Sequence, residues 1–138
     1  MSSPPRRLTL YTDGAAEPNP GPGAIGAALI DESGRVVKKI SRPIGKTTNN
    51  RAEYQALIAA LEAAAESGAE HIEIRSDSEL MVRQIQGRYK VRNRELKPLR
   101  ERGLQLLGRF QSYTIAHIPG EQNKQAHYLA HQALRHYR

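Results

Sequence analysis

One long helical pattern lies between two short strand patterns, and this order predicts a pair of parallel strands. The helical pattern begins after good N-cap candidates at residues 47–50 and continues to about Gly68. Its apolar stripe repeats at i, i+3, i+4 and i+7 and consists of Leu57, Ala60, Leu61 and Ala64. Strand patterns occupy residues 8–12 before the helix and residues 72–76 after it. A helical crossover makes the two strands that it joins parallel, so we expect both in one sheet.

The remaining patterns complete an α/β fold. Alternating and small apolar residues, separated by turn formers, predict three antiparallel strands at residues 8–12, 24–30 and 36–40. After the strand at 72–76, we expect two short helices, a fifth strand and a C-terminal helix, at residues 78–86, 94–107, 112–117 and 123–137. The inward face of the last helix is predicted to consist of Ala126, Leu129, Ala130, Ala133 and Leu134. This order implies a five-stranded mixed sheet, with antiparallel and parallel strands, flanked by helices.

Length and composition predict one domain over residues 1–138, with residues 1–6 as a disordered tail. The chain contains no cysteine, which excludes disulfides and thiolate metal sites. No apolar run approaches the roughly 20 residues that span a bilayer, and the N-terminus lacks the apolar stretch of a secretory signal. We therefore expect a soluble, cytoplasmic protein without a membrane partner, and a monomer without an obligate protein partner.

Positive charge is concentrated in one part of the chain. The net charge is +7, from 21 basic and 14 acidic residues. Lys and Arg dominate residues 83–109, whereas residues 53–79 are rich in acids. This concentration favours a polyanionic partner over a generally basic surface.

Three acids occupy positions where solvated surface carboxylates are not expected. Asp13 follows the strand at 8–12, Asp77 follows the strand at 72–76, and Glu53 lies one turn before Leu57 on the apolar stripe. Each alone has an ordinary explanation, as a turn former, an N-cap or a helix-start charge. Together they are placed to meet at one edge of the sheet, where their repulsion requires a cation. Oxygen ligands suit Mg²⁺, and paired ions of this kind cut phosphodiesters, so the acids indicate a metal-dependent nuclease.

Four short motifs resemble type 1 ribonuclease H over essentially the whole chain. They are Tyr-Thr-Asp-Gly-Ala at 11–15, Asn-Pro-Gly-Pro-Gly at 19–23, Thr-Thr-Asn-Asn-Arg-Ala-Glu at 47–53 and Ser-Asp-Ser at 76–78. The resemblance implies an endonuclease that hydrolyses the RNA strand of RNA–DNA hybrids and leaves 5′-phosphate and 3′-hydroxyl ends. It also implies two Mg²⁺ ions, or Mn²⁺, in each site with substrate.

The same resemblance assigns roles to individual residues. Asp13 is expected to bridge both ions, Asp77 to hold the ion on the attacking side, and Glu53 to bind that ion and help place the ribose 2′-hydroxyl. Recognition of this hydroxyl distinguishes RNA from DNA. Substrate contacts near the acids are expected from Gly14, Asn19, Thr48, Asn49, Asn50, Ser76 and Ser78. Turn formation by Asn19 and helix capping by Asn49 are the structural alternatives.

The chain departs from the family at its fourth carboxylate. His127 stands where the pattern Gly-Glu-x-Asn-x-x-Ala-Asp-x-Leu-Ala has Asp, and no Asp follows Asp77. His127 is therefore included among the expected catalytic and metal-binding residues, as a substitute ligand that favours Mn²⁺. Alternatively, the loss of one negative charge relieves repulsion among the acids. A third hypothesis is a catalytically weak or inert hybrid-binding module, and a double-stranded-RNA or single-strand binder is a weaker idea.

Three further features depart from or add to the family pattern. The segment 86–93 is too short for the family's basic handle, but Arg88, Lys90 and Arg92 are expected to contact DNA phosphates unless they form a solvated charge run. His117 is the nearest candidate for a product-release histidine. His127 and His131 have i, i+4 spacing, but no third zinc ligand is evident in the sequence, so we expect His131 on the surface.

Overall fold

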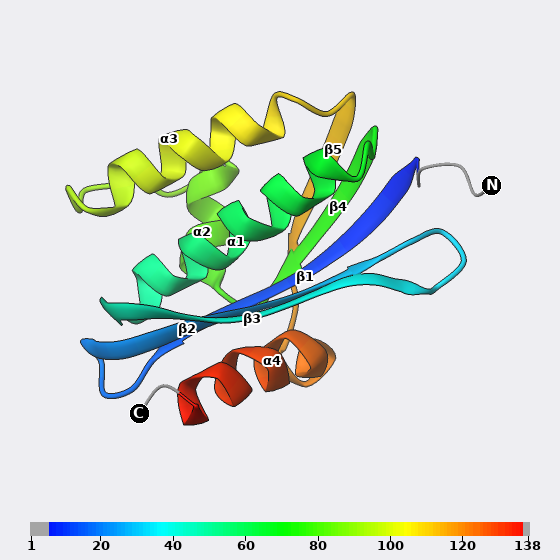
Figure 1. The fold of residues 1–138 in the computed structure, drawn as a ribbon. Coiled ribbons are helices and arrows are strands. Elements are labelled where there is room, and N and C mark those ends of the chain that lie inside the picture. Colours follow the sequence, from blue (N-terminus) through cyan, green and yellow to red (C-terminus); the bar gives the residue numbers. More distant parts are fainter. Residues whose placement is uncertain (1–5, 137–138) are drawn as a thin grey trace.

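The computed structural model describes residues 6–136 (Figure 1). Its strands are β1 (Arg7–Ala16), β2 (Gly21–Ile30), β3 (Val36–Thr47), β4 (His71–Ser76) and β5 (Ser112–His117). Its helices are α1 (Asn49–Glu66), α2 (Glu79–Ile85), α3 (Leu96–Leu107) and α4 (Lys124–Arg135), with a short 3₁₀ turn at Gly120–Gln122. The order of strands and helices is the one predicted from the sequence.

The strands form one mixed sheet in the order β3-β2-β1-β4-β5. Strand β2 pairs antiparallel with β1 and β3, whereas β4 pairs parallel with β1 and β5. The predicted five-stranded mixed sheet is therefore confirmed, and α1 is the crossover that makes β1 and β4 parallel.

The first three strands extend further than predicted. Pairing between β1 and β4 ends at Thr12 opposite Ser76, but β2 continues to pair with β1 as far as Ala16. Asp13 therefore lies within β1, opposite Gly26, and not at the end of a strand as its place after residue 12 suggested. It is the first residue of β1 beyond the pairing with β4, so its backbone pairs with β2 alone.

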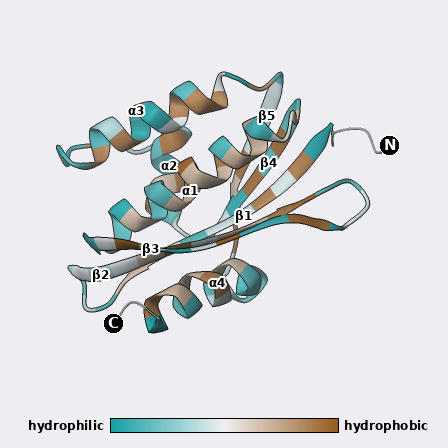
Figure 2. Cartoon of the chain, viewed as in Figure 1, coloured by the Kyte–Doolittle hydropathy of each residue, from teal (hydrophilic) through white to brown (hydrophobic). Residues whose placement is uncertain are grey.

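Helices cover both faces of the sheet, with α1 and α3 on one face and α4 on the other (Figure 1). The predicted stripe of α1 is fully buried, and so is Tyr54. On α4 the buried residues are Ala126, Leu129, Ala130 and Ala133, whereas Leu134 is only partly buried. Brown segments in the strands and on the inner faces of the helices show this apolar core in Figure 2.

Among the described residues, none of the helices is long and apolar enough to cross a membrane. The predicted N-terminal tail lies outside the described residues except for Arg6. The carbonyl of Arg6 accepts hydrogen bonds from the backbone N–H groups of Glu70 and His71, so this residue is held by the fold. The single-domain organisation stays a prediction.

Candidate active site

Three carboxylates converge where the parallel pairing of β1 and β4 ends. Asp13 comes from β1, Asp77 follows β4, and Glu53 lies in the first turns of α1. Each offers an oxygen atom within 4.8 Å of oxygen atoms from the other two. The structure thus brings together the three acids that the sequence predicted to meet.

Gly14 allows α1 to approach the sheet closely enough to place Glu53. A Cβ at Gly14 would lie 2.2 Å from the backbone carbonyl of Ala52, which is far inside van der Waals contact. At this approach the backbone N–H of Gly14 donates a 3.0 Å hydrogen bond to Oε1 of Glu53. Glycine at this position therefore sets both the distance of the helix and the orientation of the carboxylate.

Asn123 holds Asp77, and sequence reasoning assigned it no role. It lies just before α4, is 1% exposed, and donates from Nδ2 to the carbonyl of Thr12 at 2.8 Å and to Oδ1 of Asp77 at 3.1 Å. A single buried amide thus ties the last residue of β1 that pairs with β4 to the acid that follows β4. The signal available in the sequence was the pattern Gly-Glu-x-Asn that located His127, because Asn123 is the Asn of that pattern.

Burial and mutual repulsion make the acids difficult to ionise. Burial, followed by the charge of Asp77, raises the pKa of Asp13 from 3.8 to about 7, and His127 partly offsets this shift. Burial and the charges of Asp13 and Asp77 raise the pKa of Glu53 well above its usual value, against the hydrogen bond from Gly14. A divalent cation relieves such repulsion, and an all-carboxylate donor set suits hard cations. The residues present therefore fit the metal dependence that is typical of this fold family.

His127 projects from α4 toward the acids. Its Nδ1 lies 3.2 Å from Oδ2 of Asp13, which is 5% exposed. The backbone of α4 packs directly on Gly26, where a Cβ would lie 2.2 Å from the carbonyl oxygen of Ala126. Because Gly26 pairs with Asp13 in the sheet, this close approach places the first turn of α4 beside Asp13. His127 thus occupies the side of the acid cluster opposite α1.

Polar contacts fasten the loop after β1 to the start of α1. The side-chain oxygen of Asn49 accepts from the backbone N–H of Ala16 at 2.7 Å, and that of Asn19 accepts from the backbone N–H of Asn49 at 3.1 Å. The N-cap of α1 is Thr48, which accepts from the N–H of Arg51 at 3.2 Å. Capping is therefore not the role of Asn49. Asn19 and Asn49 are both exposed.

The other predicted substrate residues near the acids differ in exposure. Asn50 is exposed at the start of α1. Ser78 is the N-cap of α2 and accepts from the N–H of Met81. Ser76 is fully buried, and its hydroxyl accepts from the N–H of Ser78 at 3.0 Å. The described conformation leaves Ser76 no surface for the substrate contact predicted from the sequence.

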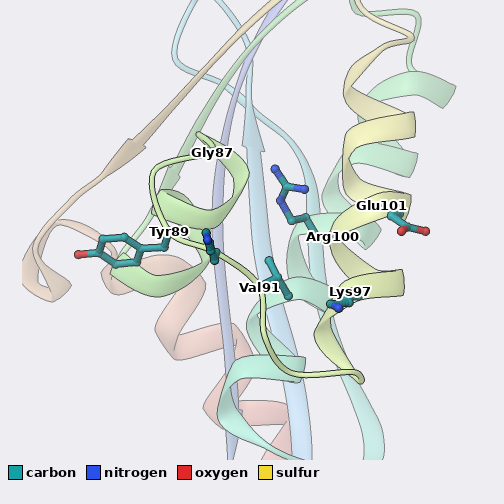
Figure 3. Close-up of a pocket in the computed structure, with 7 residues that line it drawn as sticks. Gly87, Tyr89, Val91, Lys97, Arg100 and Glu101 are labelled. Carbon is teal, nitrogen blue, oxygen red and sulfur yellow. The ribbon is translucent and has the colours of Figure 1, made fainter.

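The predicted basic residues lie in the segment between α2 and α3. Arg88, Lys90 and Arg92 are exposed there. Lys90 lines a groove of about 440 Å³ together with Tyr89, Lys97 and Arg100 (Figure 3), and no residue of the acid cluster contributes to it. The groove beside the basic segment is therefore separate from the acid cluster.

The two remaining histidines differ in their surroundings. His117 is the exposed last residue of β5 and pairs with Ser76, so it lies beside the strand that leads into Asp77. His131 is half-buried, and its ring centroid lies 4.1 Å from that of His127. Burial and the neighbouring His127 lower the pKa of His131, and Glu17 partly offsets this shift. The expected surface location of His131 is therefore only partly correct.

Comparisons with known proteins agree with this geometry. Residues 11–133 match the family described as reverse transcriptase-like. Ribonuclease HI of Halobacterium salinarum is 44% identical over 93% of this chain, which spans 64% of that relative's length. The crystal structure of RNase H1 from the same archaeon superposes with a TM-score of 0.91 and 43% identity, and the match covers 94% of this chain and 98% of that one.

A second solved structure is LC11-RNase H1 in complex with an RNA/DNA hybrid. It superposes with a TM-score of 0.89 and 40% identity, and the match covers 94% of this chain and 98% of that chain. The match to the reverse transcriptase-like family extends over most of the chain, and near-complete coverage of solved RNase H1 chains accompanies it. The chain therefore belongs to the type 1 ribonucleases H within the reverse transcriptase-like family.

Proposed function

We propose that this protein is an endoribonuclease that hydrolyses the RNA strand of RNA–DNA hybrids and leaves 5′-phosphate and 3′-hydroxyl ends. The observation that carries the proposal is the convergence of Asp13, Glu53 and Asp77 within 4.8 Å of one another. The relatives named ribonuclease H, one of them in complex with a hybrid, support the choice of substrate. We also propose that the protein acts as a cytoplasmic monomer.

The three carboxylates would hold two Mg²⁺ or Mn²⁺ ions in the presence of substrate. Bound there, these ions would supply activation of the attacking water and stabilisation of the leaving 3′-oxygen. The protein's own contribution is to keep the ligands in place. Gly14 orients Glu53 and Asn123 orients Asp77, so both carboxylates are positioned by hydrogen bonds within the fold.

Substrate recognition is proposed for polar groups around this edge. The exposed amides of Asn19 and Asn49, held together by hydrogen bonds, are suited to the minor groove, where the 2′-hydroxyl is displayed. Thr48 and Asn50 adjoin Asn49 at the start of α1, and the backbone of Gly14 contacts the first turns of the same helix. Arg88, Lys90 and Arg92 are proposed to contact the phosphates of the DNA strand.

His127 is also proposed to act at this site. Its Nδ1, 3.2 Å from Oδ2 of Asp13, supports a role at the metal site, either as a substitute ligand or as a side chain that lacks the negative charge of Asp and so reduces repulsion. The rival function, an inert hybrid-binding module, rests on the missing fourth carboxylate alone. The retained three-acid geometry favours the enzyme.

Cleavage of matched duplexes tests the proposal. An RNA–DNA hybrid, a double-stranded RNA and a double-stranded DNA of one sequence are incubated with the protein in Mg²⁺ and, separately, in Mn²⁺. We expect cleavage of the RNA strand of the hybrid alone, and a relative gain with Mn²⁺ if His127 is a ligand. Equal cutting of double-stranded RNA, or no cutting of the hybrid in either metal, would contradict the proposed function.

His127→Asp separates the hypotheses for this residue. It restores the carboxylate of the family pattern, so we expect lower Mg²⁺ concentrations to suffice for half-maximal cleavage and the preference for Mn²⁺ to diminish. Activity that appears only in this variant would show that the parent protein is the inert binding module. An unchanged metal dependence would show that His127 does not touch the metal site.

A further inference from the structure

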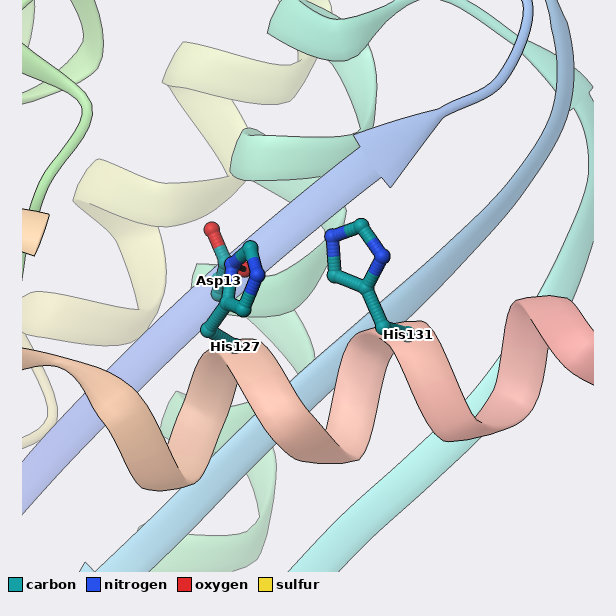
Figure 4. A group of neighbouring side chains, drawn as sticks. All are labelled: Asp13, His127 and His131. Carbon is teal, nitrogen blue, oxygen red and sulfur yellow. Dashed lines mark ion pairs between the residues drawn. The ribbon is translucent and has the colours of Figure 1, made fainter.

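A second group of possible metal ligands shares Asp13 with the acid cluster. His127 and His131 lie one turn apart on α4, and both rings rise from the same side of the helix toward β1 (Figure 4). Each of the three residues offers a ligand atom within 4.8 Å of ligand atoms from the other two. The third ligand that could not be identified from the i, i+4 histidine pattern is therefore Asp13, contributed by a strand that is remote in sequence.

The donors of this group select a different class of metal from the acid cluster. Two imidazoles and one carboxylate suit Zn²⁺ and similar transition metals, whereas Mg²⁺ prefers oxygen ligands alone. Glu17 is not among these three ligands, but its Oε1 lies 3.6 Å from Nδ1 of His131, so a rotation of its side chain would supply a fourth donor. Two nitrogens and two oxygens are enough for a tetrahedral zinc site, and histidines spaced i, i+4 on one helix face are a recurrent way to provide the nitrogens.

The scaffold of the group is fixed, while two of its side chains are free to adjust. Contact of α4 with Gly26 sets its distance from the sheet, and the hydroxyl of Ser41 donates a 2.6 Å hydrogen bond to the carbonyl of Leu129. Ligand atoms around a tetrahedral Zn²⁺ lie roughly 3.4 Å apart, so the group must contract. The side chains of His127 and Glu17 are 58% and 64% exposed, so rotation into the site meets little steric resistance.

We propose that Asp13, His127 and His131, assisted by Glu17, form a binding site for Zn²⁺ or a closely related transition metal. Because Asp13 belongs to both groups, a metal held by the histidines and the metal of the carboxylate cluster compete for its oxygens. Occupation by Zn²⁺ thus inhibits the reaction that Mg²⁺ supports. The inhibitory consequence rests on the proposed function, whereas the binding of Zn²⁺ does not.

Direct titration of the metal-free full chain tests the site. Zn²⁺ affinity is measured by calorimetry, and Co²⁺ serves as a spectroscopic probe because its visible absorption reports tetrahedral coordination. The informative variant is His131→Gln, which leaves all three carboxylates and His127 in place. The matched control is His136→Gln, an exposed histidine just beyond the end of α4. Cleavage of a hybrid in Mg²⁺ with increasing Zn²⁺ is measured on the same proteins.

We expect one Zn²⁺ per chain and a loss of affinity of at least about 10-fold in His131→Gln, because even groups that only orient a metal ligand contribute about 10–100-fold, with no change in His136→Gln. His131→Gln should keep cleavage in Mg²⁺ and need correspondingly more Zn²⁺ for inhibition. Equal Zn²⁺ affinity in the parent and His131→Gln would overturn the site, and Zn²⁺ binding through His131 without inhibition would overturn the competition for Asp13. No cleavage by the parent in Mg²⁺, together with Zn²⁺ binding that depends on His131, would contradict the proposed function and leave the zinc site standing.

Discussion

At the scale of single residues, Asp13 is the group on which most of the chemistry depends. It is almost fully buried, adjoins Asp77 and lies beside His127. A carboxylate in such a place stays protonated to unusually high pH, because burial and a like charge both penalise its ionised form. The position that lets Asp13 bind a cation also makes its ionised carboxylate destabilise the folded protein when no cation is bound.

Asp13 should therefore make the metal-free protein less stable as pH rises. Its pKa is about 7 in the folded state against 3.8 ordinarily, so the folded state binds the extra proton between these values. This proton contributes fully to the free energy of unfolding below about pH 4. The contribution is lost as pH rises through 7, which lowers the free energy of unfolding by at most about 4 kcal/mol. In EDTA, we expect Asp13→Asn to melt above the parent at pH 8 and the difference to shrink at pH 5.

Asp31→Asn is the control for this measurement. The hydroxyl of Ser33 and the backbone N–H groups of Ser33 and Arg35 lower the pKa of Asp31, so its contribution has the opposite sign and is lost on acidification. We expect Asp31→Asn to melt at or below the parent at pH 8. Parallel pH profiles for the parent and Asp13→Asn in EDTA would show that Asp13 is not destabilising.

At the scale of secondary structure elements, two glycines set how closely helices approach β1 and β2. Gly14 faces the backbone of α1 and Gly26 faces the backbone of α4, and a Cβ at either position would lie 2.2 Å from a main-chain atom. Backbone cannot yield as a flexible side chain can. The two helices that bring Glu53 and His127 to Asp13 are thus positioned by the absence of side chains beneath them.

Gly26→Ala should push α4 away from the sheet. We expect a loss of about 1–3 kcal/mol in the free energy of unfolding, as for other overpacked sites, and weaker metal binding through His127. Gly103→Ala is the matched control, because Gly103 lies within α3 and has more room. A Cβ there would meet only the side chains of Ile85 and Leu57, at ordinary distances of 3.6 and 3.7 Å. That change should stabilise the protein by about 0.5–1 kcal/mol. Denaturant unfolding of both variants measures the difference, and equal effects would contradict the close-packing explanation.

At the scale of the whole molecule, the site joins residues that are distant in sequence, and this limits what sequence reasoning can find. The order of elements and the buried stripe of α1 were predictable, because periodicity is a local property. The true extent of β1 was not, because pairing with β2 prolongs it as far as Ala16. The hydrogen bonds of Asn123 and the closeness of His131 to Asp13 were missed for the same reason. Each depends on a contact between residues that are more than 100 positions apart in the sequence.

At the same scale, the positive charge of the segment between α2 and α3 is expected to attract the phosphates of a hybrid. If Lys90 and Arg92 contact phosphates, the double change to Gln should weaken hybrid binding and reduce the dependence of log affinity on log salt by about 1–2. The double change of Lys38 and Lys39 to Gln, on exposed positions of β3, removes the same charge elsewhere and should alter the slope less. Fluorescence anisotropy across a salt series measures both. Equal slopes for the two variants would place the phosphate contacts elsewhere.

The most direct test of the three-carboxylate site compares cleavage and binding in one variant. Asp13→Asn keeps the size of the side chain and removes the charge that a cation requires. The parent should cut the RNA strand of a hybrid in Mg²⁺ or Mn²⁺, whereas Asp13→Asn should bind the same hybrid at least as tightly and cut nothing. Cleavage by Asp13→Asn at the parent's rate would contradict the assignment of Asp13, and with it the proposed catalytic site.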